Sequence, residues 1–198
     1  MKELLITIDN DKDLNNFYKK LRLYKIIYKN RILKLYINKN IIKGKNLDEL
    51  LMCEKAFNIK NKNERLEYVY DAICDYHDKL YINTNICEFD KEGRCICQRE
   101  YHHPAKTNGC CGTCTYIGKN GCTIKSIACK SHFCRYITKK KNIPSFRNGK
   151  LFKYFLTPAQ KNVASINYWN TKEENLKIMK KNSFIYLFFM KDKKMKRW

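Results

Sequence analysis

The segment that decides the fold of this chain is 110–134, which reads CCGTCTYIGKNGCTIKSIACKSHFC. It lies in a longer stretch, 87–134, that holds nine of the chain's 11 cysteines and three of its four histidines. Residues 101–172 contain no Asp or Glu. Because the donors on offer are sulfur and imidazole, this composition favours zinc or an iron–sulfur cluster over calcium or magnesium.

Four of these cysteines have the spacing of a structural zinc site. Cys111 and Cys114 form a CxxC knuckle. Cys129 follows after 14 intervening residues, and Cys134 after four more. The pattern C-x2-C-x14-C-x4-C has the general form of two knuckles separated by a loop, in which four thiolates surround one tetrahedral ion. We therefore predict a metal site built from these four cysteines.

The remaining cysteines of the cluster predict a second site. The stretch is polar and offers little core for more cysteines to pack into, so burial alone does not explain them. Candidate ligands for the second site are Cys87, Cys95 and Cys97, completed by Cys110, Cys122, His102 or His103. His132 lies between two predicted ligands, and we expect it to be a neighbour of the site rather than a ligand.

Other cysteine chemistries fit the sequence less well. The odd cysteine count and the adjacent pair Cys110-Cys111 disfavour a disulfide scaffold. The radical-SAM signature CxxxCxxC fails because Ile117 stands where its third cysteine belongs. A thioredoxin-like CxxC would need a strand before it, and here the turn-forming Asn108-Gly109 precedes it. No carboxylate pair, nucleophile–base set or phosphate-binding glycine loop stands out, so the sequence offers no reason to expect an enzyme.

The segment from Gly121 to Lys130 is similar to the second half of the YkgJ-type cysteine-cluster family, bacterial proteins described as binding zinc or an iron–sulfur cluster. That family combines an adjacent double cysteine with a Gly-Cys step, a short spacer and a final cysteine followed by Arg or Lys. The chain departs from it because Cys114 follows the double cysteine, the spacer lacks Arg-Pro, and Cys134 is additional. The resemblance spans 110–134 and implies metal ligation by Cys110, Cys111, Cys122 and Cys129.

Before the cluster the apolar pattern is helical. Apolar residues at steps of three and four predict one helix with its buried face between Leu14 and Tyr28. Asn46 or Asp48 is expected to cap a second helix, and a third is predicted over 63–80. These helices also carry three residues outside the metal prediction: Cys53 and Cys74, expected to be buried as small hydrophobes, and His77, expected to be a packed or surface histidine.

After the cluster, two local signals predict helix starts. Thr157-Pro158 reads as an N-cap followed by proline at the first helical position, opening a helix to about residue 167. Thr171 and Glu174 have the spacing of a capping box. The apolar run 183–190 fits either a strand or a continuation of that last helix.

These patterns predict a mainly α fold, in which a helical body surrounds an irregular, cysteine-rich, metal-stapled module. The expected regions are a helical N-terminal region at 1–80, the metal-binding module at 81–137, and a helical C-terminal region with a basic tail at 138–198. The longest apolar run is too short to span a membrane, and the opening residues do not form a secretory signal. We therefore expect a cytoplasmic protein.

The net charge of +22 allows a nucleic-acid contact through the acid-free segment. Lys outnumbers Arg 33 to eight, as an AT-rich genome would produce, and ligating thiolates would remove part of the surplus. The basic residues available to phosphate are Lys106, Lys119, Lys125, Lys130, Arg135 and Lys139 to Lys141. The sequence thus predicts a bacterial metal-binding protein, with zinc favoured, whose cysteine cluster is mainly structural. The alternative is an iron–sulfur protein with a redox or maturation role.

Overall fold

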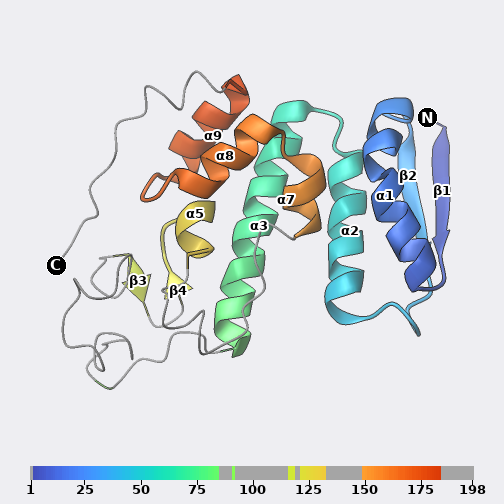
Figure 1. Ribbon diagram of the computed structural model, residues 1–198, viewed down its shortest axis with the longest axis horizontal. Coiled ribbons are helices and arrows are strands. Elements are labelled where there is room, and N and C mark those ends of the chain that lie inside the picture. The colour runs from blue at the N-terminus through green and yellow to red at the C-terminus, as the bar shows by residue number, and fades with distance from the viewer. Residues whose placement is uncertain (1, 85–90, 92–115, 119–120, 133–148, 184–198) are drawn as a thin grey trace. The chain divides into compact units, whose positions relative to one another are not determined.

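The computed structural model describes residues 2–84, 91, 116–118, 121–132 and 149–183 (Figure 1). The chain divides into two compact units. The first comprises Met1–Ala72 and Arg147–Thr157, and the second comprises Ile73–Phe146 and Pro158–Trp198. The mainly helical character predicted from the sequence is confirmed for the described residues.

The first unit begins with a β-α-β arrangement. Strand β1 (Glu3–Ile8) is followed by helix α1 (Asp11–Ile27), and the chain then returns to strand β2 (Ile32–Ile37). The two strands pair in parallel, from Glu3 beside Ile32 to Ile8 beside Ile37. Helix α2 (Gly44–Asn58), the first part of helix α3 (Lys62–Thr84) and the short helix α7 (Lys150–Phe155) complete this unit.

The parallel strand pair corrects the prediction that everything before the cysteine cluster is helical. In β1, Leu4, Ile6 and Ile8 are more buried than the residues between them, so the strand buries one face with a period of two. That period is visible in the segments ELLITI and ILKLYI, which are rich in β-branched and aliphatic residues. The prediction rested on the three- and four-residue steps of α1, and it therefore overlooked the period of two in the strands.

Helix α1 forms as the apolar pattern predicted. Asn10 caps it by accepting hydrogen bonds from the backbone N–H groups of Lys12 and Asp13. Its buried face consists of Leu14, Phe17, Tyr18 and Leu21. The predicted cap of α2 is wrong. This helix starts at Gly44, ahead of Asn46, because the left-handed φ of +54° suits a glycine at that turn.

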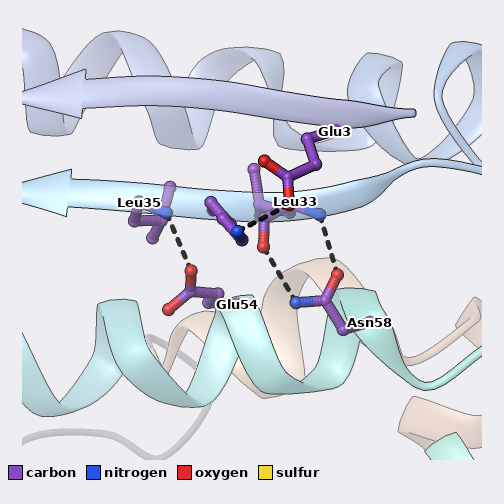
Figure 2. A network of polar contacts seen from close by, with 6 residues as sticks. Glu3, Leu33, Leu35, Glu54 and Asn58 are labelled. Carbon is purple, nitrogen blue, oxygen red and sulfur yellow. Dashed lines mark hydrogen bonds and ion pairs between the residues drawn. The ribbon is translucent and has the colours of Figure 1, made fainter. Parts of the chain in front are cut away.

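Helix α2 closes the outer edge of β2 with side chains (Figure 2). The Asn58 carboxamide accepts a hydrogen bond from the Leu33 N–H at 2.8 Å and donates one to the Leu33 carbonyl at 2.9 Å. The Glu54 carboxylate accepts from the Leu35 N–H at 2.7 Å. These bonds satisfy strand groups that would otherwise need another strand or water.

The second unit contains the residues that surround the described part of the cysteine cluster. Its elements are the end of α3, the short strands β3 (Ile117–Gly118) and β4 (Gly121–Cys122), and the helices α5 (Ile127–Lys130), α8 (Pro158–Ile166) and α9 (Lys172–Lys181). The predicted helix after Thr157-Pro158 is confirmed as α8. The predicted capping box is confirmed in α9, where Thr171 and Glu174 bond each other's backbone N–H.

None of the helices in the described part of the chain is both long enough and apolar enough to cross a membrane. The apolar run 183–190, which fitted either a strand or a helix, lies outside the described residues except for Ser183.

Candidate metal centre

The structure describes two of the nine predicted cysteine ligands, Cys122 and Cys129. Both are buried, and they lie in one apolar cluster with Ile124, against which Tyr116, Tyr168 and Trp169 pack. The other predicted ligands lie outside the described residues, namely Cys87, Cys95, Cys97, Cys110, Cys111, Cys114 and Cys134, as do the alternatives His102 and His103.

A short hairpin positions Cys122. Strands β3 and β4 pair antiparallel, with Ile117 opposite Cys122. Just beyond the hairpin, the backbone N–H and the hydroxyl of Thr123 both donate to the Tyr116 carbonyl, at 2.7 and 3.0 Å. Cys122 therefore sits at the end of a turn fixed on both sides, where a side chain holds a defined direction.

The start of α5 positions Cys129. Ser126 caps this helix, and its hydroxyl accepts from the Cys129 N–H at 3.5 Å. The same hydroxyl donates to the Asn167 carbonyl at 2.8 Å, although the two residues are 41 positions apart. Ser126 thereby connects the cysteine turn to the segment between α8 and α9.

That segment supplies a hydrogen bond to sulfur. The backbone N–H of Trp169 donates to the Cys129 Sγ at 3.1 Å. Trp169 has φ of +60°, a left-handed conformation that costs a bulky residue on the order of 1 kcal/mol or more. The buried Asn175 carboxamide holds the turn by accepting from Asn167 and Asn170. Several hydrogen bonds therefore hold this turn in its strained conformation, in which the Trp169 N–H donates to the Cys129 thiol.

These contacts change the pKa of the Cys129 thiol. A hydrogen bond from Cys122 is the main cause that lowers the pKa of Cys129 to about 7, against the opposing effect of burial. The Trp169 N–H, Ser126 and Lys130 act in the same direction. A lowered thiol pKa favours the thiolate, which is the form that binds metal ions.

Lys130 supports the pair from the other side. The residue is 3% exposed, and its ammonium group donates to the Cys122 carbonyl at 2.8 Å and pairs with Asp78 of α3. This position corrects one detail of the sequence prediction, because a buried, paired lysine is not presented to phosphate. Lys125, by contrast, is exposed.

The two histidines in the described part of this unit have different environments. His77 is 1% exposed, as expected for a packed histidine, and burial lowers its pKa to about 4. His132 lies in the turn after α5, with its ring edge-on to Tyr168 at 5.7 Å between centroids. Within the described ranges, no group of three or more His, Cys, Asp or Glu residues is arranged to hold a metal ion.

The described geometry thus brings two buried thiols, Cys122 and Cys129, into one cluster. Sequence reasoning found both cysteines but missed Ser126, Trp169 and the Asn175 turn. The only sequence signal near these residues was Lys130, the basic residue after Cys129, which is part of the family resemblance. The bonds from Ser126 to Asn167 and from Trp169 to Cys129 join residues 41 and 40 positions apart, so no local pattern predicts them.

Comparison with known proteins does not place this chain in a family. No family model, curated protein or solved structure matches the chain.

Proposed function

We propose that this chain is a metal-binding protein whose cysteine cluster holds zinc in a mainly structural role. The observation that carries the proposal is the pair of buried thiols at Cys122 and Cys129, of which Cys129 accepts a backbone N–H bond from the strained Trp169. Two adjacent buried thiols packed only for apolar contact would need no such donor. Hydrogen bonds to ligand sulfur are the usual means of orienting and tuning a thiolate site.

The remaining ligands of the proposed site come from the other predicted cysteines, Cys87, Cys95, Cys97, Cys110, Cys111, Cys114 and Cys134. Their number, with the described pair, is enough for two tetrahedral sites. Ligand thiolates lose their protons on binding, and the Cys129 environment has already lowered that cost. Because such stretches fold only when their ligands are held together, the metal would supply folding energy for the second unit.

A nucleic-acid contact through the acid-free segment is the second part of the proposal. Its support in the described residues is the exposed Lys125, which follows the buried Ile124 of the thiol cluster. Phosphate contacts of this kind weaken steeply with salt. We expect a labelled single-stranded oligonucleotide to bind in a fluorescence-anisotropy titration at low salt and to dissociate as salt rises. Absence of binding at low salt would remove this part of the proposal and leave the metal site untouched.

The decisive experiment is elemental analysis together with a visible spectrum on protein purified without oxygen. We expect about one or two zinc ions per chain and a colourless solution. A brown protein containing iron and acid-labile sulfide would replace zinc by an iron–sulfur cluster, the alternative with the same thiolate donors. Protein that retains neither metal, and whose nine cluster cysteines all react with a thiol reagent in the folded state, would overturn the proposal.

A further inference from the structure

Among the described residues, the outer edge of strand β1 has no backbone hydrogen-bond partner. The Lys2 and Ile8 carbonyls accept bonds from the strand-β2 side, from the N–H groups of Ile32 and Asn38. Because N–H and C=O directions alternate along a strand, the backbone groups of the three odd-numbered residues of β1 point away from β2. Those residues are Glu3, Leu5 and Thr7. No described residue donates to or accepts from these outward groups.

The backbone groups at the two edges of the strand pair differ in their hydrogen-bond partners. On the β2 side, Glu54 and Asn58 of α2 reach the Leu33 and Leu35 backbone and close the edge, as Figure 2 shows. On the β1 side no described residue covers the edge, and the segment ELLITI contains no proline and no lysine, its one charged residue being Glu3. An edge of this length and composition is a template for another strand.

The outer face of the strand pair is also uncovered. Leu5 is 55% exposed and Tyr36, beside Thr7 in the register, is 57% exposed. Parallel strands are normally covered on both faces, and a sheet this small gains stability from additional strands. The open edge and the exposed apolar side chains are therefore continuous parts of one surface.

We propose that β1 pairs antiparallel with β1 of a second copy of this chain, about a two-fold axis at Leu5. In this register Leu5 lies opposite Leu5 of the other copy, and Glu3 lies opposite Thr7, so no like charges face each other. About six interchain hydrogen bonds would satisfy the outward backbone groups. The strand is thus complementary to itself, as a two-fold interface requires.

Charge favours this surface for self-association over the rest of the chain. Two copies that each carry a formal charge of +22 repel one another across most of their surfaces. On this face the lysine beside Leu5 in the register, Lys34, is paired with Glu3. Repulsion between copies is therefore small where the open edge lies.

The expected dimer is weak. A single strand edge buries far less than the roughly 800 Å² per partner of a standard interface, so a dissociation constant on the order of 10–1,000 µM is expected. Sedimentation of the full chain from about 5 µM to about 1 mM should therefore show a monomer converting to a dimer. Amide exchange should show the Leu5 and Thr7 N–H groups becoming protected over the same range.

Charge variants at the two-fold axis test the register. The Leu5→Lys and Leu5→Glu variants should each be monomeric, because like charges would face each other across the axis. An equimolar mixture of the two should associate again at least as strongly as the parent chain. The control is Leu51→Lys, which places the same charge on an exposed leucine of α2, 44% exposed, and should leave the dimer intact.

Three outcomes of these experiments would overturn the proposal. A parent chain that stays monomeric throughout the range overturns the proposal, as does a dimer that survives Leu5→Lys or a mixture that fails to associate. If a Leu5 variant unfolds, judged by circular dichroism, the amide-exchange protection of Leu5 and Thr7 in the parent chain decides alone. This surface is independent of the cysteine cluster, and metal-loaded protein should be used throughout.

Discussion

Two buried thiols, one in each unit, have opposite chemistry. Cys53 in the first unit is fully buried, and burial, followed by the neighbouring Glu49 charge, raises the pKa of its thiol. Cys129 in the second unit is 6% exposed, yet hydrogen bonds from Cys122 and Trp169 help to lower the pKa of its thiol to about 7. Almost equal burial is thus accompanied by opposite shifts of the thiol pKa in the two units.

The comparison shows which structural feature distinguishes the two thiols. Burial by itself places a thiol in the core, where it behaves as a small hydrophobe. Donors aimed at the sulfur make the difference, and here they come from a backbone in a strained conformation. Each of the following predictions tests whether that distinction between the units is real.

The largest effect is expected from removing the Cys129 thiol. The Cys129→Ser variant should lose about one metal ion per chain, because a tetrahedral site does not survive the loss of a ligand. Zinc sites in small modules supply on the order of 10 kcal/mol of folding energy, so the second unit should melt far earlier. Elemental analysis and thermal unfolding would measure both.

The matched control is Cys53→Ala. It removes an equally buried thiol and should keep the full metal content, with a stability loss of about 1–2 kcal/mol from the small cavity. If both variants kept all their metal, the distinction between the two thiols would have no functional meaning.

The next effect concerns His77, a buried titratable group of the second unit. The pKa of His77 is about 4 in the folded chain and about 6.5 when unfolded. Below pH 6.5 the unfolded form therefore takes up the proton first, and stability falls until the pH reaches 4. The linked loss is about 3 kcal/mol and is absent above pH 6.5.

Denaturant unfolding at pH 7 and pH 4.5 would measure this loss, with His77→Gln as the comparison. Protonation of ligand thiolates affects both proteins alike, so the difference between them isolates the imidazole. Equal pH dependence in the two proteins would show that His77 does not titrate as its burial requires.

Local signals in the sequence predicted those elements that local interactions stabilise. The α9 capping box and the proline at the start of α8 are read directly from neighbouring residues. The burial of Cys53 and Cys74 followed from their positions among apolar residues and is confirmed. The parallel pairing of β1 with β2 was missed because a short strand is stable only when it is paired, and the partner of β1 lies about 29 residues away.

The candidate site, too, could be predicted only in its local features. Residue type and spacing singled out Cys122 and Cys129, although spacing alone assigned them to different sites. The contacts that distinguish them, from Ser126 to Asn167 and from Trp169 to Cys129, join sequence-distant segments through backbone atoms. A backbone N–H is present in almost every residue, so no side-chain pattern could have revealed which one is used.

A smaller effect is expected from Ser126→Ala. The variant removes the α5 cap and the bond to Asn167, at a cost of about 1–2 kcal/mol. It also removes a group that lowers the pKa of Cys129, so the midpoint for alkylation of that thiol should move above about 7 in metal-free protein that circular dichroism shows to be folded. Peptide mapping across a pH series would measure it. Ser165→Ala, which removes a helix-surface bond to Lys161, should leave the midpoint unchanged.

The smallest effect tests the first unit. The Tyr18 hydroxyl is buried beside Cys53 and Glu49, and among the residues that the structure describes it has no hydrogen-bond partner. Burial accordingly raises the pKa of Tyr18. Because an unsatisfied hydroxyl is costly, Tyr18→Phe should leave the free energy of unfolding unchanged or raise it by about 1 kcal/mol. The half-buried Tyr154, stacked on the Tyr18 ring, provides the control variant Tyr154→Phe. A clear loss of stability in Tyr18→Phe alone would mean that the Cys53 environment does satisfy polar groups, and the contrast with Cys129 would weaken.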